Sequence, residues 1–412
     1  MRSDVLVLGS GIIGLGIALY LQEKGRSVTL VDRRGPGEET SFGNAGIIQR
    51  EAIMPYTFPD DPLTLIQAAL NIRVDAYYQM ASLKTVAPWL YEYWRHSSPE
   101  KIAATAAARA PLFEICLIEH DRLAEAAGAS AQLRRNGWIK IFRKDKNLAE
   151  EIGKANDLVP YGIKADILNH RQLAELEPHL GDELIGGVHW KDPYSLADPH
   201  ALSQAYAKLF EARGGRFVQG DARTLQQDAD GWSVAVEDGR ESAGDCVVAL
   251  GPWADDVTVP LGYKLPLGVK RGYHMHYSTK GNATLNHTLL DGDVGFAIAP
   301  MSKGIRLTTG AEFAERDAPP SYVQLERAEP VLRKLLPIGD RVDPEPWLGR
   351  RPCTPDMIPV MGPAPRHKGL WFSFAHAHHG LTLAGSAGRF MAELVCGEKP
   401  FCDPKPYRVD RF

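Results

Sequence analysis

The sequence predicts an α/β fold in which a parallel-sheet domain is interleaved along the chain with an antiparallel-sheet α+β domain. Residues 4–24 read as a buried strand, a glycine turn and a helix, and buried strands return at 245–250 and 370–375. Short alternating strands fill residues 264–312. Strands buried on both faces are continuous apolar runs, whereas half-exposed strands alternate, so the two patterns indicate two kinds of sheet. A length of 412 residues suits two domains.

The same patterns predict where the chain changes domain. We expect the first domain to be discontinuous and to comprise residues 1–62, 190–262 and 345–412. The second domain would take residues 63–189, which include a helical insertion, and residues 263–344.

The individual elements follow from periodicity, caps and breakers. We expect strands at 4–8, 27–31, 136–142, 216–219, 232–237, 245–250, 273–277, 295–299, 305–309 and 370–375. Helices are expected at 12–24, 199–213, 319–336 and 382–396, within 63–128, and as short pieces within 146–180. Asp198 is expected to be the N-cap of the helix at 199–213, and Pro199 its first helical residue.

Composition excludes several classes of function. A net charge of −4 gives no bulk attraction for nucleic acid, so we expect no such partner. The five cysteines are scattered without C-x-x-C spacing, which argues against disulfides and zinc and favours a cytoplasmic location. No run reaches the roughly 18–20 apolar residues of a membrane span. Peripheral attachment to the inner face of the cytoplasmic membrane stays open.

The glycine turn has the pattern G-x-G-x-x-G and lies between a strand and a helix. Gly9 permits the tight turn, Gly11 lets backbone approach a pyrophosphate, and Gly14 lets the helix pack on the strand. Asp32, at the end of the next strand, would bind ribose hydroxyls and repel the 2′-phosphate of NADP. The motif alone does not choose between FAD and NAD. The contacts expected from this Rossmann-like unit are Gly9, Gly11, Ile12, Ile13, Gly14, Asp32 and Arg33.

Four further motifs follow in order. They are Thr40-Ser41-Phe42-Gly43-Asn44-Ala45-Gly46, the strand end Val248-Ala249-Leu250-Gly251-Pro252-Trp253, the segment Trp347–Asp356 with the pattern W-x-G-x-R-P-x-T-P-D, and Ala375–Thr382. With these motifs the chain resembles, nearly end to end, FAD-dependent oxidoreductases of the D-amino acid oxidase type. Within that family it is most similar to bacterial D-amino acid dehydrogenases and D-hydroxyproline dehydrogenases. The resemblance implies a Rossmann-like FAD-binding domain with a glutathione-reductase-type βαβ unit, interleaved with a substrate domain.

The resemblance also assigns cofactor contacts. It places a loop around the pyrophosphate and ribityl chain, a second ADP-contacting strand, a backbone contact to adenine, and a loop beneath the flavin edge. These contacts would be Thr40, Ser41, Asn44, Ala45, Gly46, Ile47, Ala222, Ala249, Gly251, Trp253, Gly349, His379, Gly380, Leu381 and Thr382. Leu250 and Ala375 stand where the family commonly has smaller residues, which leaves the geometry of both segments open.

Three residues are candidates for the substrate side. By the same match Arg351 would bind a substrate carboxylate, since a guanidinium makes two parallel charge-assisted hydrogen bonds; pairing with an internal acid is the alternative. Tyr273 would add a hydrogen bond to substrate, or pack in the sheet core. His378 would lie on the substrate side. Three histidines within residues 376–379 lack a nearby acid or cysteine, so we expect no metal.

The implied reaction is oxidation of a D-amino acid, or of a cyclic imino acid such as D-proline, by hydride transfer to flavin N5. A glycine- or sarcosine-type amine oxidase and a flavin-binding subunit without turnover are the alternatives. A nicotinamide enzyme would not explain residues 40–46 and 375–382, and an RNA-modification protein would need a basic face. The electron acceptor (a quinone, the respiratory chain or O₂), the individual amino acid and the subunit number are not determined by the sequence.

Overall fold

The chain opens with a parallel βαβ unit, as the sequence predicts. Strand β1 (Ser3–Leu8) leads through the glycine turn into helix α1 (Ile12–Glu23) and strand β2 (Val28–Asp32). The computed structural model describes residues 2–412, and in it β1 and β2 pair in parallel with Val5 opposite Val28. Val5 and Val7 face one apolar cluster and Leu6 and Leu8 face another, so this strand is buried on both sides.

The βαβ unit belongs to a seven-stranded sheet. Parallel pairings give the order β10 (Arg216–Asp228), β2, β1, β12 (Gly239–Val248) and β21 (Leu370–Phe374). Strand β20 (Val360–Pro363) adds an antiparallel edge, and β11 (Gly231–Val236) joins the extended ends of β10 and β12. Sequence-distant strands therefore meet in one Rossmann-like layer, and the predicted fold class is confirmed.

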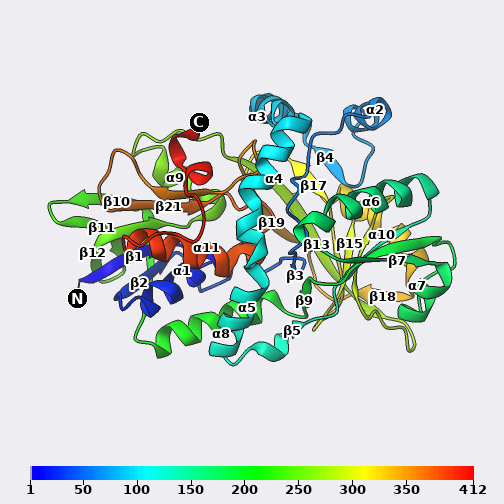
Figure 1. Ribbon diagram of the computed structural model, residues 1–412, viewed down its shortest axis with the longest axis horizontal. Helices are drawn as coiled ribbons and strands as arrows, with labels where there is room; N and C mark the ends of the chain where they lie inside the picture. Colours follow the sequence, from blue (N-terminus) through cyan, green and yellow to red (C-terminus); the bar gives the residue numbers. More distant parts are fainter. Residues whose placement is uncertain (1) are drawn as a thin grey trace.

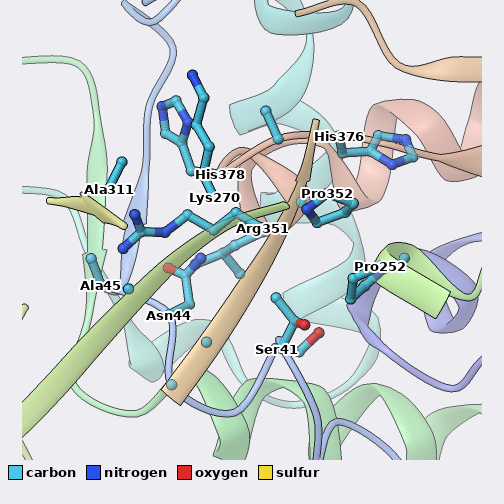
Figure 2. A pocket seen from close by; sticks show the side chains of 18 of the residues that line it. Ser41, Asn44, Ala45, Pro252, Lys270, Ala311, Arg351, Pro352, His376 and His378 are labelled. Carbon is cyan, nitrogen blue, oxygen red and sulfur yellow. The ribbon is translucent and has the colours of Figure 1, made fainter. Parts of the chain in front are cut away.

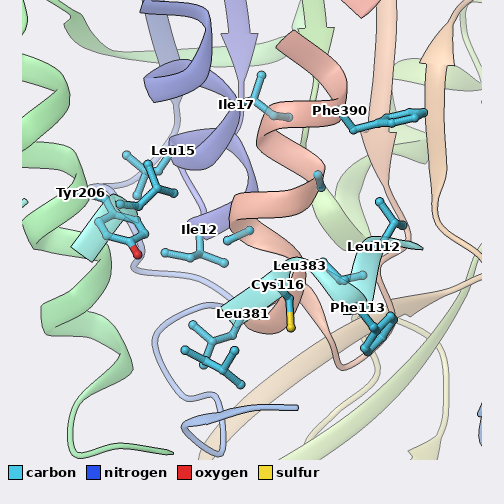
Figure 3. Packing of buried hydrophobic residues seen from close by; sticks show 14 of the residues in the cluster. Ile12, Leu15, Ile17, Leu112, Phe113, Cys116, Tyr206, Leu381, Leu383 and Phe390 are labelled. Atoms are coloured by element: carbon cyan, nitrogen blue, oxygen red, sulfur yellow. The ribbon is translucent and has the colours of Figure 1, made fainter. Parts of the chain in front are cut away.

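Helices cover the face of this sheet that Val5 and Val7 line. They are α1, α4 (Pro99–Glu114), α5 (Cys116–Ala126), α8 (Pro199–Ala212) and α11 (Gly380–Val395). Figure 3 shows side chains of α1, α4, α5, α8 and α11 meeting in one apolar cluster. The side chain of Asp198 accepts hydrogen bonds from the backbone N–H groups of His200 and Ala201, which confirms the predicted cap of α8.

The second sheet has eleven strands. Its order is β4 (Ala76–Tyr78), β17 (Ala311–Phe313), β13 (Gly268–Thr279), β16 (Gly304–Thr308), β15 (Ala297–Met301), β14 (Thr288–Asp291), β6 (Trp138–Phe142), β8 (Gly186–Trp190) and β7 (Ala165–Asn169), with β18 (Ile338–Arg341) and β19 (Trp347–Cys353) also pairing with β13. Most pairs are antiparallel, but β14–β6 and β17–β4 are parallel. These parallel pairs join segments far apart in sequence, which no hairpin connects.

The remaining elements surround these two sheets. A small third sheet contains β3 (Ile47–Ile48), β9 (Tyr194–Leu196) and β5 (Leu133–Arg134). The other helices are α2 (Pro62–Ala69), α3 (Leu83–Arg95), α6 (Asp145–Asp157), α7 (His170–Leu176), α9 (Asp255–Thr258) and α10 (Val323–Leu335). Figure 1 shows the first sheet on the left and the second on the right, with α4 crossing the view between them.

Some local expectations differ from the structure. The segment expected to contain only short helices includes β7, which pairs with β8, a strand not expected from the sequence. Strand β19 lies in the second sheet although residues 345–412 were assigned to the first domain, and α4 and α5 pack on α11 although residues 63–189 were assigned to the second. The spacing of apolar residues along a segment predicts a helix or a strand, but it does not predict which sheet that element joins or packs on. The domain boundaries themselves stay a proposal. No helix within residues 2–412 is long and apolar enough to cross a membrane.

Candidate active site

A cavity of about 960 Å³ extends from the ends of β1 and β2 to β13 and β19. Most residues that the sequence singles out lie along it. The predicted residues that line it are Gly9, Gly11, Ile12, Ile13, Asp32, Arg33, Thr40, Ser41, Asn44, Ala45, Ile47, Ala222, Ala249, Gly251, Trp253, Tyr273, Gly349, Arg351, His378, Gly380 and Leu381. Gly14, Gly46, His379 and Thr382 are not among the lining residues. The tertiary structure thus gathers motifs from both ends of the chain around one space.

The glycine turn brings backbone segments into contact. Gly9 has φ +105°, and a Cβ there would stand 2.4 Å from the carbonyl oxygen of Ala249, at the end of β12. A Cβ on Gly14 would stand 1.8 Å from the Gly9 carbonyl oxygen. Oδ2 of Asp32 accepts hydrogen bonds from the Ser10 backbone N–H (2.7 Å) and hydroxyl (3.1 Å), so this carboxylate also holds the turn.

The N-terminus of α1 opens onto the cavity and fits a pyrophosphate. Gly11 is the N-cap residue and supplies no capping side chain, while the Ile12 N–H donates to the hydroxyl of Ser41 at 3.0 Å. Gly11, Ile12 and Ile13 line the space in front of the helix. Free N–H groups and the positive end of the helix dipole favour a phosphate there.

The loop of residues 40–46 is held by side chains of the second sheet. Nη1 of Arg306 donates to the Asn44 carbonyl at 2.5 Å, and Nδ1 of His274 lies 3.2 Å from the Gly43 carbonyl oxygen. A Cβ on Gly43 would stand 2.2 Å from the ring of Trp347, so only glycine lets the loop lie on that ring. These contacts place the loop against the cavity.

A cluster of two histidines and an acid supports Arg306. The ligand-type atoms of His274, His276 and Asp343 lie within 4.8 Å of one another. His276 already uses both ring nitrogens, because Nε2 accepts from Nε of Arg306 at 2.9 Å and Nδ1 pairs with Asp343. The cluster therefore orients Arg306, and a guanidinium beside it opposes a second cation.

The segment 375–379 turns back toward the cavity through left-handed backbone. Ala375 has φ +61° and Ala377 has φ +52°, so alanine adopts at both positions a left-handed conformation that favours glycine. The Ala377 N–H donates to the Pro352 carbonyl at 2.9 Å, which ties this segment to β19. Thr382 lies behind the cavity wall, where its hydroxyl accepts from the Gln49 N–H at 3.0 Å.

Arg351 projects into the far end of the cavity. Its Nη1 donates to the Gly310 carbonyl at 2.9 Å and its Nη2 to the Thr309 carbonyl at 3.2 Å, and the side chain lies across Gly272, where a Cβ would stand 2.1 Å from Nη2. Within residues 2–412 no carboxylate pairs with Arg351, so the structure does not support the alternative that Arg351 pairs with an internal acid. Burial lowers the pKa of this guanidinium from its ordinary value.

Arg350 has a different environment. Its Nε donates to the Arg316 carbonyl at 2.9 Å and lies 3.8 Å from an oxygen of Asp317. These contacts are made within the protein, and Arg350 does not line the cavity.

Tyr273 lines the cavity but its hydroxyl is engaged elsewhere. The hydroxyl donates to Oε2 of Glu312 at 2.6 Å and accepts from Nη2 of Arg271 at 2.8 Å and from the Ser321 N–H at 2.9 Å. Glu312 and Arg271 form a fully buried ion pair. Because three partners surround the hydroxyl, binding substrate through it would require one of these bonds to break.

The histidines at 376–379 are neutral, and His376 and His379 are buried while His378 is partly exposed. Burial lowers the pKa of His376 to about 3, and burial with the nearby charges of Arg351, Arg109 and Lys270 holds the pKa of His378 well below its ordinary value. Nε2 of His378 is buried without a hydrogen-bond partner in the protein, and its ring lies 4.8 Å from that of Tyr56. His378 therefore lines the cavity with its ring, while its Nε2 is turned away from the open space.

Sequence reasoning missed several residues of this site. Lys270 and the aromatic residues Tyr56, Phe58 and Tyr93 line the cavity. Arg109, on α4, lies behind it and contacts Nδ1 of His379 at 3.2 Å. The single arginine in the alanine-rich run around residue 109 was a usable signal of a buried charge, but nothing local marks Lys270.

A glycine turn that opens onto a shared cavity, with a partly buried guanidinium at the other end, is typical of a dinucleotide-dependent oxidoreductase. The family model described as "FAD dependent oxidoreductase" (DAO) matches residues 4–394, and the chain belongs to this family, with FAD as its cofactor.

Its relatives support this assignment. A D-amino acid dehydrogenase of Xylella fastidiosa (strain M12) is 31% identical over 95% of this chain and 92% of its own length. A D-amino-acid oxidase of Bradyrhizobium diazoefficiens is 28% identical over 99% of this chain and 98% of its own length. The crystal structure of glycine oxidase from Geobacillus kaustophilus superposes with a TM-score of 0.75 at 22% identity, covering 100% of this chain and 99% of that one, and shows the same fold.

Proposed function

We propose that this enzyme oxidises the bond between the α-carbon and nitrogen of a D-amino acid or a cyclic D-imino acid. The observation that carries the proposal is the guanidinium of Arg351, which lines the cavity, is partly buried, and has only carbonyl partners in the described chain. A partly buried cation without an acidic partner favours an anionic ligand, and a carboxylate matches its planar fork. Relatives named D-amino acid dehydrogenase and D-amino-acid oxidase support this substrate class.

The roles of the side chains follow from their contacts. The Gly310 and Thr309 carbonyls fix the orientation of Arg351, and its remaining N–H groups bind the substrate carboxylate. His378 lines the cavity near Arg351 and Lys270, and its neutral ring would form part of the wall on the substrate side. Bound FAD supplies the two-electron acceptor for the substrate C–H bond. Water then converts the imino acid to a 2-oxo acid and ammonia, whereas a proline substrate leaves as the cyclic imine.

Gly9, Gly11, Ile12, Ile13, Asp32 and Ser41 would hold the ADP half of FAD. The lining residues Thr40, Asn44, Ala45, Gly349, Gly380 and Leu381 would hold its flavin half. This assignment rests on the continuity of the cavity between the two sets of residues and on the open N-terminus of α1.

Anaerobic flavin reduction tests the proposal. Purified holoenzyme is mixed with the D- and L-forms of alanine, proline, aspartate and glutamate, with cis-4-hydroxy-D-proline, and with glycine and sarcosine, and loss of the oxidised-flavin absorbance is followed. We expect reduction by D-forms only. Reduction by glycine or sarcosine alone would instead support the amine-oxidase alternative. A bound flavin that no substrate reduces would support a subunit without turnover.

The acceptor is a separate proposal. We propose reoxidation by a quinone or another component of the respiratory chain, because the relative with 31% identity is named a dehydrogenase. Turnover with a quinone analogue or dye that exceeds turnover with O₂ by at least tenfold is the expected result. Equal rates with O₂ would identify an oxidase.

An apolar surface near the cavity supports peripheral membrane attachment. Ten large apolar side chains between residues 54 and 94 are exposed: Met54, Tyr56, Leu63, Leu65, Ile66, Leu70, Ile72, Met80, Tyr91 and Trp94. We call this set the α2–α3 surface, and Figure 1 shows both helices at the top edge of the molecule. Thr64 and Ala68 of α2 line the cavity, so the surface lies on elements that cover the site. Aliphatic side chains mixed with tryptophan and tyrosine suit a bilayer interface.

Vesicle sedimentation tests this attachment. We expect wild-type protein to sediment with phospholipid vesicles, and Ile66→Glu combined with Leu70→Glu to abolish sedimentation. Ile118→Glu is the matched control, since Ile118 is 65% exposed but lies on α5 outside the surface. If wild-type protein stays in the supernatant and light scattering shows a dimer that the double variant breaks, the surface is an interface between copies of the chain.

A further inference from the structure

Lys270 and Arg351 face each other across two paired strands. The register of β13 with β19 places Lys270 directly opposite Arg351, and opposite residues of an antiparallel pair point to the same face of the sheet. Both side chains line the cavity, and Figure 2 shows them with His378 around one region. Lys270 is only 8% exposed. The fold therefore holds two cationic groups next to each other in a nearly closed space.

The ammonium group of Lys270 lacks an anionic partner. Its Nζ lies 3.9 Å from the ring centroid of Tyr93, 5.6 Å from that of Trp89 and 5.8 Å from that of Phe313. Within residues 2–412 its one hydrogen-bond contact is with the thioether of Met357 at 3.9 Å. No carboxylate within residues 2–412 forms an ion pair with it. Ring faces stabilise a cation only in part, so a buried ammonium in this setting favours an anion from outside the protein.

The acids around this end of the cavity are already paired. Oδ1 of Asp75 accepts from Nε of Arg73 at 2.7 Å, and Oδ2 of Asp291 pairs with Nη1 of Arg143 at 2.6 Å. The cationic charges of Lys270 and Arg351 are thus not neutralised within the described chain. One substrate carboxylate can neutralise one of them.

We infer that the substrate is dicarboxylic: Arg351 binds the carboxylate next to the reacting nitrogen, and Lys270 binds a second carboxylate. The inference rests on the proposed function and narrows its substrate class to acidic amino or imino acids such as D-aspartate and D-glutamate. The rings of Tyr93, Trp89 and Phe313 surround the ammonium group at the second site. If both cations instead share one carboxylate, Lys270 would matter equally for every amino acid.

Matched substrate pairs separate these two arrangements. D-Glutamate and D-glutamine, or D-aspartate and D-asparagine, have nearly the same size and differ by one charge. We expect wild-type enzyme to have the higher kcat/KM for the acid of each pair. Lys270→Met keeps the length of the side chain and removes its charge, and it should lower the acid-to-amide ratio of kcat/KM by roughly 10- to 100-fold, the range of a charged hydrogen bond. Lys191→Met, at a half-exposed pair with Asp166, should leave the ratio unchanged.

A binding measurement makes the test independent of turnover. Calorimetry of the FAD-loaded enzyme with succinate and glutarate, compared with butyrate, should show tighter binding of the dicarboxylates, and Lys270→Met should remove the difference. An equal fall of kcat/KM for acid and amide, or equal affinity for mono- and dicarboxylates, would overturn the inference. If dicarboxylates bind selectively but no amino acid reduces the flavin, the proposed function fails and the two-anion site stands.

Discussion

Gly388 of α11 lies directly on Gly16 of α1, and a Cβ on Gly388 would stand 2.7 Å from the Gly16 carbonyl carbon. A Cβ on Gly16 would stand 2.3 Å from the carbonyl oxygen of Ala384. Helix α1 follows the glycine turn and α11 follows the 375–379 segment, so this contact fixes two walls of the cavity relative to each other. Side chains larger than hydrogen at this crossing would separate the helices.

Gly16→Ala should therefore destabilise the protein although alanine favours helices. Overpacking of a close contact costs about 1–3 kcal/mol. We expect the free energy of unfolding in urea to fall by that amount, and less FAD to remain bound after gel filtration. Gly153→Ala is the control, because Gly153 lies in α6 with open space around it and should gain about 0.5–1 kcal/mol. Equal effects of the two substitutions would show that the helix crossing tolerates a methyl group.

Arg351→Met should weaken substrate binding without loss of the flavin. Removing one partner of a buried charge pair costs about 2–5 kcal/mol, so kcat/KM for amino acids should fall by a factor between about 30 and several thousand. The visible spectrum of the bound flavin should persist. Arg350→Met is the comparison, since Arg350 contacts the Arg316 carbonyl and does not line the cavity. A KM that Arg351→Met leaves unchanged would remove Arg351 from substrate binding.

The affinity for dicarboxylates should depend on the charge of Lys270. Burial, with a smaller contribution from the nearby Arg351 and against an opposing effect of Cys353, lowers the pKa of Lys270 to about 8. Tyr93 and neutral His378 also face Lys270. The ammonium form predominates well below pH 8, is half lost near pH 8, and disappears as the pH rises further. KM for D-glutamate should therefore increase above about pH 8, while KM for D-glutamine changes less. The same rise in both KM values would argue against a role for Lys270 in binding the second carboxylate.

Glu312→Gln tests the buried network around Tyr273. The change leaves Arg271, which is fully buried, without its counterion, and such a break costs about 3–5 kcal/mol. We expect a large fall in the free energy of unfolding. Tyr273→Phe removes one hydroxyl and should cost about 1 kcal/mol. If Tyr273→Phe raises the KM for an amino acid more than it lowers stability, the hydroxyl binds substrate as the sequence resemblance suggested.

The sequence by itself determined the turns, helix starts and buried strands, because these depend on residues that are neighbours along the chain. The apolar run of β1, the glycines at 9, 11 and 14, and Asp32 predict the nucleotide-binding βαβ unit, because turn geometry and strand burial are properties of short segments. Asp198 likewise predicts the start of α8. The order of motifs along the chain predicted the family and FAD.

Only the tertiary structure decided which distant residues share a space. The pairing of β13 with β19 places Lys270 beside Arg351, eighty-one positions further along the chain, and a lone lysine in a strand gives no sign of that neighbour. Folding likewise engaged the hydroxyl of Tyr273 with Glu312 and Arg271. Sheet register and long-range packing depend on the whole chain, so the charge of the cavity, and with it the inferred substrate class, emerges only when both sheets are assembled.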